Sequence, residues 1–511
     1  MKYSMHRPSG KNAGLTVLLA VLLTAVQVFG LIACSETASE DGGTVSDAFA
    51  VQQTAEAGTS EEALPEETEI RPDLPDKTFG GAEFRILQLS LGEGHIHSFF
   101  EYDTEELTGE LLNDAIYNRN LAIEAQYDTV ITAEDADTPQ SRMTRDVKAG
   151  ETSYQAVADW PTRMASLSAE GALYNLRTVP WIDLEKPWWD GNAAEAYSVR
   201  GKQYLTTGDY VLYDKQRILI FFFNHDMADN FGISDLYATV WEGEWTVDRM
   251  NGCVSLGTSD LNGDGKLDCM DDSFGMISGS YTYMPYLLFG MGCTYSKQDG
   301  DGNYSLNICT EHTVDVIGSL AESFYGDNTI WWEGVSGRTD GMWHIFEEGR
   351  GLFFHEVSQV IRLMDMDQRY GILPQPKYDT EQEFYMTAGQ SDYSAALGIP
   401  VSLSGETLER TGIMLEALSA LSHTTTYPTF IEDIMQMKKA PDPDSAEILK
   451  MIHEHIVYDL FSIFKPGNIQ DVVAQNIYKQ HGEGFVSAVE KNEKVIMKSF
   501  EKLLAKYDDL P

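Results

Sequence analysis

Apolar and polar residues follow two different rhythms along most of the chain. In Leu111–Tyr127 the apolar residues recur at three- and four-residue intervals, which predicts an amphipathic helix. Arg217–Asn224 is a nearly continuous apolar run, as expected for a strand that is buried on both faces of a sheet. Further strands are predicted at residues 84–90, 154–160, 274–280, 349–356 and 369–376. Because helical and strand patterns alternate, we expect an α/β fold, with mostly helical sequence from Glu406 onward.

The N-terminus has the pattern of a secretion signal, which we assign to residues 1–33. Lys2, Arg7 and Lys11 give it a positive start, and the apolar run Leu15–Ala33 follows. The run ends in "LIAC", which resembles the lipobox of bacterial lipoproteins and implies that Cys34 carries lipid, palmitate included. The alternative is an uncleaved anchor helix with an unrelated cysteine. The resemblance therefore predicts a lipid-anchored protein on the extracytoplasmic face of a bacterial cell membrane.

Residues 34–73 are predicted to form a disordered, acidic tether. Between Ser35 and Ile70 there is no Lys or Arg, and Ser, Thr, Ala, Gly and Glu dominate. Such a segment has too few large apolar side chains to offset the entropy lost on folding. The whole chain of 511 residues has a formal net charge of −44, which repels phosphate backbones. We therefore expect no nucleic-acid partner.

The stretch "DLNGDGKLDCMD", residues 260–271, has the spacing of a twelve-residue calcium loop. The predicted Ca²⁺ ligands are the side chains of Asp260, Asn262 and Asp264, the carbonyl of Lys266, Asp268 through water, and Asp271, with Asp272 as the less favoured substitute for Asp271. Gly265 allows the sharp turn at position six. No helix pair flanks the loop in the sequence pattern, so we expect a structural calcium clip and not a sensor. A calcium-free acidic turn is the alternative.

Four further cysteines lie in the middle of the chain. Cys253 precedes the calcium loop and Cys269 lies within it, whereas Cys293 and Cys309 are centred on residue 301 in the turn signal "DGDGN". A symmetric hairpin would place the latter two opposite each other. Disulfides 253–269 and 293–309 are the favoured pairing, with free thiols as the main alternative.

The order of several segments resembles the extracytoplasmic solute-binding proteins of carbohydrate-importing ABC transporters, the group that includes the maltose-binding protein. The segments are "EFRIL", "TGELLNDAIYNRN", "AVADWPTRMASLSAEGALYNL", "RILIFFFN", "GLFFHEVSQVIR", "YGILPQPK" and "LGIPVS". The resemblance implies two α/β lobes joined by hinge strands, with chain crossings near residues 208–212, 390–393 and 440. It assigns residues 74–210 and 392–440 to lobe 1, and residues 211–391, with the calcium loop, and the C-terminal helices 441–511 to lobe 2.

The resemblance also indicates which side chains face the cleft between the lobes. The candidate ligand-binding residues are Trp160, Arg163, Asp209, Tyr281, Trp332, His355, Glu356 and Asp392, with Trp331 and Tyr393 as neighbours of two of them. Aromatic rings suit the C–H faces of sugars, and planar polar groups suit their paired hydroxyls. Arg163 is compatible with an acidic sugar. For each candidate the alternative is ordinary packing in a loop or in the core.

Motifs of enzymes are scarce in this sequence. His453 and His455 are two positions apart and so point to different faces of a helix, and no nucleophile elbow or phosphate-binding glycine loop is found. We therefore expect a monomeric, non-catalytic receptor that captures an oligosaccharide for an ABC-transporter permease. A cell-surface carbohydrate-active enzyme is the alternative. A dockerin-type assembly module is disfavoured because such modules carry two calcium loops in tandem.

Overall fold

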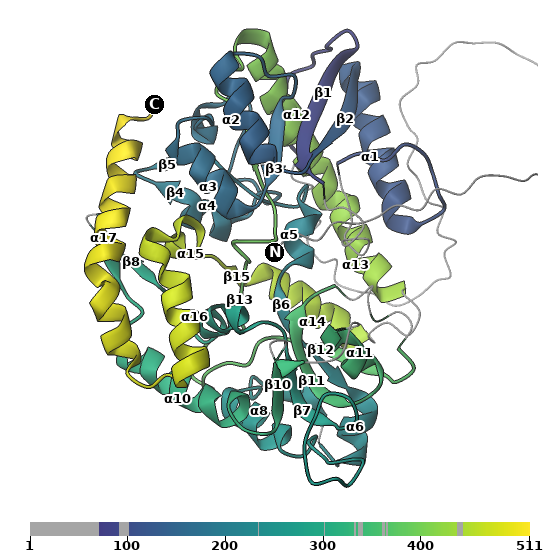
Figure 1. The fold of residues 1–511 in the computed structure, drawn as a ribbon. Helices are drawn as coiled ribbons and strands as arrows, with labels where there is room; N and C mark the ends of the chain where they lie inside the picture. The colour runs from purple at the N-terminus through teal and green to yellow at the C-terminus, as the bar shows by residue number, and fades with distance from the viewer. Residues whose placement is uncertain are drawn as a thin grey trace, which may run out of the picture. The chain divides into compact units, whose positions relative to one another are not determined.

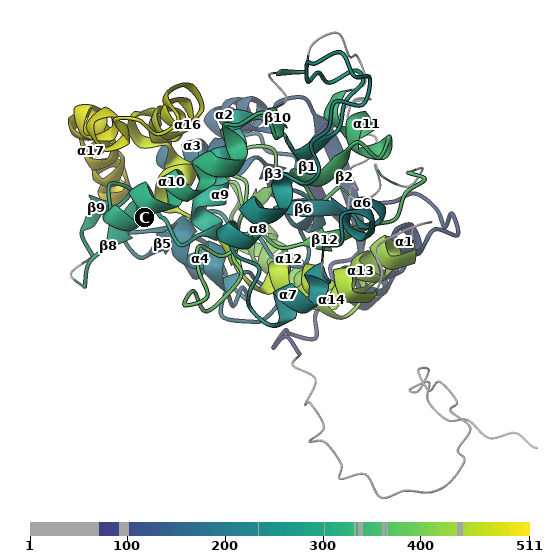
Figure 2. The ribbon, with the colours of Figure 1, turned by 90° about the horizontal axis from the view of Figure 1, so that it is seen from below.

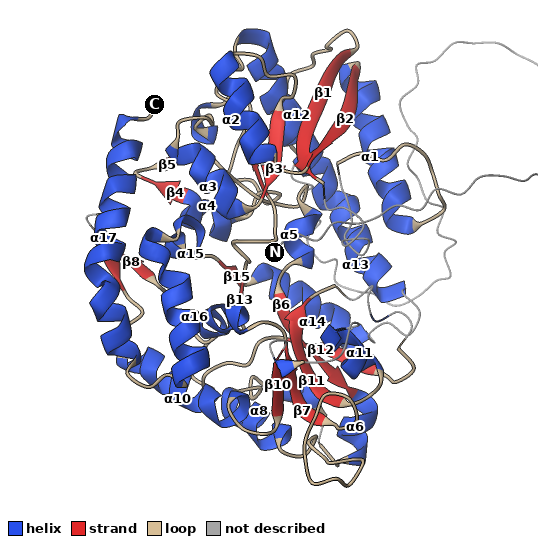
Figure 3. Ribbon diagram, in the orientation of Figure 1, coloured by secondary structure: helices blue, strands red, loops and turns tan. Residues whose placement is uncertain are grey.

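The computed structural model describes residues 71–90, 102–233, 235–300, 302–331, 334–335, 341–359, 363, 366–436 and 443–511. Among these residues the strands form two main sheets, each flanked by helices, together with short two-stranded ribbons (Figures 1 and 3). This architecture confirms the predicted α/β fold. The predicted signal peptide, Cys34 and most of the predicted tether lie outside the described residues. Every helix in the described part of the chain is too short or too polar to cross a membrane.

The first sheet has four strands in the order β14-β3-β1-β2. Their bounds are Ala82–Leu89 for β1, Thr129–Ala136 for β2, Ala156–Asp159 for β3 and Ala396–Gly398 for β14. The central strand β1 runs parallel to β2 and β3, with Phe84 opposite Ile131 and Ile86 opposite Ala156. The late strand β14 joins antiparallel to β3. Chain from far along the sequence thus completes the first lobe.

Helices cover both faces of this sheet, so β1 buries apolar residues on both sides. Phe84 and Ile86 share a core cluster with residues of α1 and α12, whereas Leu87 points to the other face and clusters with Met143 of α2 and Met164 of α3. The helix bounds are Leu111–Tyr127 for α1, Pro139–Ala149 for α2, Pro161–Ala169 for α3, Gly405–Thr424 for α12 and Thr426–Gln436 for α13. Both α2 and α3 begin with proline, which fits the first helical turn.

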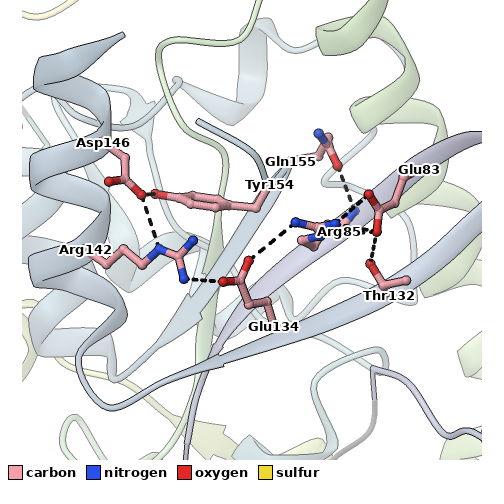
Figure 4. Close-up of polar contacts among 8 residues, drawn as sticks. All are labelled: Glu83, Arg85, Thr132, Glu134, Arg142, Asp146, Tyr154 and Gln155. Atoms are coloured by element: carbon pink, nitrogen blue, oxygen red, sulfur yellow. Dashed lines mark hydrogen bonds and ion pairs between the residues drawn. The ribbon is translucent and has the colours of Figure 1, made fainter. Parts of the chain in front are cut away.

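A chain of ion pairs crosses β1, β2 and α2 at the partly exposed end of the first sheet (Figure 4). Arg85 pairs with Glu83 at 2.7 Å and lies 3.6 Å from Glu134, which also pairs with Arg142. Arg142 in turn lies 3.3 Å from Asp146, one helical turn further along α2. These side chains remain partly in water, so each pair contributes at most about 1 kcal/mol to stability. The network therefore contributes more to the orientation of α2 on the sheet than to the stability of the fold.

The second sheet has five strands in the order β10-β7-β11-β6-β12. Their bounds are Leu219–Asn224 for β6, Phe274–Ser278 for β7, Thr329–Trp331 for β10, Gly351–Val357 for β11 and Tyr370–Leu373 for β12. Every residue of β6 is buried, as its continuous apolar run predicted, and so is every residue of β11. β11 runs parallel to β7 and antiparallel to β6, with His355 opposite Phe221.

Helices of the second lobe follow from recognisable local signals. Thr246 caps α8 by accepting a bond from Arg249 N at 3.3 Å. Gly275 in β7 allows α8 to approach, because an added Cβ would lie 1.6 Å from the Val254 carbonyl oxygen. α8 packs on β7 and α10, α11 packs on β11, and α14 packs on β12. The bounds are Val247–Val254 for α8, Met284–Gly290 for α9, Glu311–Phe324 for α10, Gly341–Glu347 for α11 and Pro443–Glu454 for α14.

The connections between the two lobes meet around a buried lysine. α5, Leu212–Gln216, leads from the first lobe into β6 and carries Lys215, whose Nζ lies 3.0 Å from Asp190. Tyr458 donates to Asp214 at 2.8 Å and follows β15, which pairs with β13 of the returning chain. Burial raises the pKa of Asp214 to about 6, although the neighbouring Lys215 opposes this shift. The bounds are Thr387–Ala388 for β13 and Ile456–Val457 for β15.

The C-terminal helices contact elements of both lobes. α15 (Leu460–Phe464) packs on α3 and on α4 (Gly191–Tyr197) of the first lobe, and α16 (Ile469–Gln480) packs on α9 of the second. α17 (Phe485–Asp509) contacts both α3 and the strand β9 (Tyr304–Leu306), and it lies on the side opposite α1 in both views (Figures 1 and 2). The sequence interpretation placed residues 441–511 with lobe 2 alone, whereas these described helices bridge the two.

Candidate ligand-binding cavity

A cavity of 710 Å³ lies between segments that are far apart in the sequence. Its lining comes from Arg217 before β6, residues 279–286, α11, the end of β11, residues 390–393 and residues 465–474. Volumes of a few hundred to 1,000 Å³ are typical of small-molecule sites. Of the eight predicted ligand residues, Glu356 and Asp392 lie in this lining.

Glu356 is a mostly buried carboxylate at the end of β11, only 8% exposed. Its Oε1 accepts hydrogen bonds from the Tyr283 hydroxyl and from Val357 N, both at 2.9 Å. Gly279 makes room for this pair, because an added Cβ would lie 2.1 Å from the Tyr283 ring. Burial, and next the charge of Glu356, raises the pKa of Tyr283, so its hydroxyl stays a donor. Arg217 supplies a positive charge to the same wall.

Tyr286 joins two other parts of the lining through its hydroxyl. The hydroxyl lies 3.0 Å from Ser391 Oγ, and Gln470 Nε2 donates to it at 3.0 Å. Tyr286 belongs to α9, Ser391 to the chain returning to the first lobe, and Gln470 to α16. This network therefore fixes three distant segments around one side of the cavity.

Asp392 contacts two segments that are far apart in the sequence. Thr162 at the start of α3 donates to Asp392 Oδ1 at 2.8 Å, and the Lys465 ammonium pairs with Oδ2. Lys465 has a left-handed backbone with φ of 44°, as does Asn468 with φ of 61°. Non-glycine residues in this region are uncommon and cluster at functional sites. Asp392 thus has the position predicted from the sequence, with a lysine partner that was not predicted.

Trp160 and Arg163 lie next to the cavity and are absent from its described lining. The Arg163 guanidinium lies 3.7 Å from the centre of the Trp160 ring and pairs with the buried Asp159 at 3.1 Å. Burial raises the pKa of Asp159, although bonds from Trp160 N and Arg163 lower it. The Tyr393 ring, which does line the cavity, lies 4.5 Å from Trp160. Because Arg163 is occupied by Asp159, it offers little support for an acidic sugar.

His355 belongs to the core of the second lobe, which contradicts its predicted role as a ligand contact. The side chain is fully buried and stacks on Phe221 with ring centres 4.8 Å apart. Neighbouring residues of a strand point to opposite faces, so Glu356 reaches the cavity and His355 does not. Burial lowers the pKa of His355 to about 3, which keeps the imidazole neutral.

Three further predicted residues lie elsewhere or outside the described part of the chain. Asp209 accepts a bond from the His423 ring, which raises the pKa of that histidine. The Tyr281 ring stacks on Tyr478 with centres 4.9 Å apart, and Tyr283 takes the position in the described lining instead. Trp332 is outside the described residues, whereas its neighbour Trp331 packs on Phe324.

The predicted calcium loop is an exposed turn held by its own carboxylates. Asp260 accepts from Gly263 N at 2.6 Å and Gly265 N at 2.8 Å, and Asp264 accepts from Lys266 N at 2.9 Å. Asp272, and not Asp271, is fully buried at the base of the loop. The other predicted ligands Asn262, Asp268 and Asp271 are exposed. Among the described residues no group of three or more His, Cys, Asp or Glu side chains is close enough to hold a metal ion. Calcium binding at this loop stays a prediction.

The four central cysteines are thiols in the structure. Cys253, Cys269, Cys293 and Cys309 form no disulfide, so the favoured pairing is not observed. The hairpin predicted around residue 301 is present as β8 (Ser296–Gln298) and β9 (Tyr304–Leu306). Burial raises the pKa of Cys293 to about 11, which disfavours the reactive thiolate.

The sequence interpretation missed most of the polar lining. Arg217 was read as the first residue of a strand, and Tyr283 was passed over for Tyr281 two positions earlier. Lys465 and Gln470 carry no local signal, because they reach Asp392 and Tyr286 from a distant part of the chain. A polar residue directly before a buried strand, as at Arg217, is the one signal that was available.

Comparisons with known proteins support the fold. No family model and no curated protein matches the chain. Solved structures do match. An ABC substrate-binding protein from Listeria monocytogenes, solved with cycloalternan, has a TM-score of 0.52 at 14% identity and covers 82% of this chain and 99% of its own.

Two further structures give the same result. UgpB from Mycobacterium tuberculosis, solved with glycerophosphocholine, has a TM-score of 0.53 at 12% identity, covering 83% of this chain and 99% of its own. The cyclic α-maltosyl-1,6-maltose binding protein from Arthrobacter globiformis has a TM-score of 0.52 at 12% identity, covering 82% and 99%. The chain therefore has the two-lobed fold of ABC substrate-binding proteins, as the sequence resemblance predicted.

Proposed function

We propose that this protein is an extracytoplasmic receptor that binds an oligosaccharide and delivers it to an ABC-transporter permease. The observation that carries the proposal is the 710 Å³ cavity, whose lining combines aromatic rings with hydrogen-bonded polar groups. Two of the similar structures, from Listeria monocytogenes and Arthrobacter globiformis, are binding proteins whose ligands are saccharides. The fold likeness supports the class of protein, and the cavity chemistry supports the class of ligand.

The lining suits a polyhydroxylated ligand. Tyr283, Tyr286, Trp343 and Tyr393 supply ring faces and edges, and Glu356, Asp392 and Gln470 supply planar acceptors and donors. Sugar hydroxyls bind such groups in pairs, while sugar C–H faces lie against aromatic rings. Tyr283 and Thr162 already orient the two carboxylates, which lowers the entropy lost when a ligand binds.

Further parts of the proposal rest on the sequence. The lipobox-like "LIAC" supports a lipid anchor at Cys34, and the spacing of residues 260–271 supports a structural Ca²⁺ ion. We propose that the receptor acts as a monomer and performs no covalent chemistry. The permease would recognise the closed, ligand-bound form, since hinge closure is the usual response of two-lobed binding proteins.

A thermal-shift screen tests the proposed function. The probes are neutral tetrasaccharides of the glucan, xylan and mannan types, with glycerol as the control for nonspecific stabilisation. A ligand at 100 times its Kd should stabilise the folded state by about 2.7 kcal/mol, because it binds the native state alone. We expect at least one tetrasaccharide to raise Tm in a concentration-dependent way. If none moves Tm more than glycerol does, the proposal is wrong.

A further inference from the structure

Tyr393 combines three properties at the edge of the cavity. Its ring lines the cavity, its side chain is 50% exposed, and its backbone has φ of 65°. Left-handed backbone is uncommon for non-glycine residues and is a genuine outlier for bulky ones. A large apolar ring left half in water gains little from burial. Neither the backbone conformation nor the exposure of Tyr393 is therefore explained by folding stability.

The residues before Tyr393 are held on several sides. Thr162 N donates to the Ser391 carbonyl at 3.1 Å, and Thr162 Oγ1 donates to Asp392 at 2.8 Å. Ser391 Oγ also contacts the Tyr286 hydroxyl, and Lys465 pairs with Asp392. A strained conformation persists only where its surroundings determine it. Here these hydrogen bonds and the ion pair fix the backbone next to Tyr393 and therefore the direction of its ring.

Behind Tyr393 lies a stack of supporting groups. The Tyr393 and Trp160 ring centres are 4.5 Å apart, and the Arg163 guanidinium lies 3.7 Å from the Trp160 centre. The two rings are tilted by 52°, so Tyr393 packs on Trp160 at an angle. Arg163 is in turn fixed by the buried Asp159. The contacts therefore run from Asp159 through Arg163 and Trp160 to Tyr393, and Tyr393 is the member that reaches the described lining.

We propose that Tyr393 is the platform on which a pyranose ring of the ligand stacks, and that Trp160 and Arg163 act as positioning residues behind it. This inference rests on the proposed function. A pyranose offers an apolar C–H face that matches the exposed face of a tyrosine ring. The strained backbone is then explained by ligand binding, since it directs the ring toward the cavity. Trp160 itself, and Tyr281 with its ring on Tyr478, are not the platforms in this arrangement.

Substitutions at Tyr393 test the inference with whichever tetrasaccharide of the panel stabilises the wild-type protein. Tyr393→Ala should weaken binding at least ten-fold, and Tyr393→Phe, which keeps the ring, should bind within about two-fold of wild type. The matched control is Trp181→Ala. Trp181 is also a half-exposed aromatic residue, at 40%, with a left-handed φ of 72°, but it does not line the cavity. Its variant should bind as tightly as wild type in calorimetry.

A second pair of variants tests the role of the backbone. Glycine adopts φ of 65° with little cost and alanine does not, so Tyr393→Gly should have a higher Tm than Tyr393→Ala. Both should bind the tetrasaccharide equally weakly. A purely structural role for Tyr393 would instead make affinity follow Tm across the variants. That result would overturn the proposal.

The outcomes separate this inference from the function on which it rests. If the wild-type protein binds no saccharide of the panel, both the function and the platform are wrong. If the wild-type protein binds and Tyr393→Ala binds equally well, the receptor function stands and the platform is wrong. Equal losses in Tyr393→Ala and Trp181→Ala would also contradict a platform at Tyr393.

Discussion

At the scale of single residues, His355 shows how burial sets a charge state in this protein. The imidazole stacks on Phe221 inside the second sheet and has a pKa of about 3, lowered by burial from an ordinary value of 6.5. The unfolded chain binds a proton near pH 6.5, whereas the folded chain does so only near pH 3. Stability must therefore fall as pH decreases from about 6.5 toward 3.

Replacing this imidazole should remove part of the acid sensitivity. His355→Phe keeps an aromatic ring against Phe221 and cannot take up a proton. Between pH 6 and pH 4 the free energy of unfolding should fall less steeply in the variant, by up to about 1.4 kcal/mol per pH unit. Urea denaturation at a series of pH values measures the slope. Equal slopes in the two proteins would contradict a buried neutral His355.

Glu356 and His355 also show what a sequence can indicate about a site. The pattern at residues 349–356 predicted a strand, and the structure places β11 there with every residue buried. The same continuous burial hides which face meets the cavity, because the alternation of polar and apolar residues that would reveal it is absent. Both neighbours were therefore predicted to bind ligand, and the structure places one of them in the core.

At the scale of elements, local patterns predicted strands, helices and one hairpin register well. Cysteines 293 and 309 are centred on residue 301, and the β8–β9 ladder has the same centre, with Ser296 opposite Leu306 and Gln298 opposite Tyr304. The expected disulfide does not follow from this register. Cys293 lies buried beyond the ladder, beside the Thr313 side chain, and Cys309 is partly exposed. Facing positions in a hairpin do not by themselves satisfy the narrow geometry of a disulfide.

The loop at residues 260–271 carries the prediction of a structural calcium ion. Asp260, Asn262 and Asp264 keep oxygen lone pairs beyond those used by backbone N–H groups, and Gly265 has the left-handed φ of 78° that the turn requires. We expect millimolar calcium to raise Tm, and Asp264→Ala to abolish the rise. The exposed Asp315 in α10 offers a matched control, Asp315→Ala, which should keep the full calcium effect. Chelation that leaves the wild-type Tm unchanged would exclude the clip.

At the scale of the whole molecule, α17 connects the lobes at the end of the chain. Tyr507 is fully buried, its hydroxyl bonds Ser168 of α3, and its ring packs on Tyr204 with centres 5.5 Å apart. Phe500, two turns earlier, packs on Tyr304 of β9 in the second lobe. The helix therefore holds both lobes through two aromatic contacts.

Truncating Tyr507 should be strongly destabilising. Tyr507→Ala removes a buried aromatic ring, and we expect a loss of roughly 3–5 kcal/mol in the free energy of unfolding. Tyr507→Phe keeps the ring and removes only the hydroxyl bonded to Ser168, so its loss should be about 1 kcal/mol. Chemical denaturation followed by circular dichroism measures both. Similar denaturation midpoints for wild type and Tyr507→Ala would show that the contacts of α17 do not stabilise the first lobe.

The cavity is built from segments that are far apart in the sequence, which is why little of its lining could be predicted. The local pattern predicts mostly helical sequence after Glu406 and a strand at Arg217–Asn224, but it contains no information on which distant segment each will meet. Gln470 reaches Tyr286, and Lys465 reaches Asp392, only through the tertiary arrangement. The resemblance located the second crossing, and hence Asp392 and Tyr393, because the order of segments reflects the whole fold.

The most direct test of the central claim is a calorimetric titration of the wild-type protein with the tetrasaccharide that stabilises it most, followed by chromatography of the same sample. A receptor that binds its ligand in the 710 Å³ cavity should take up one ligand per chain with a negative heat-capacity change, because apolar surface is buried. The saccharide should be recovered intact after prolonged incubation. Absence of binding heat across the panel, or recovery of shortened saccharides at an enzyme-like rate, would contradict a non-catalytic carbohydrate receptor.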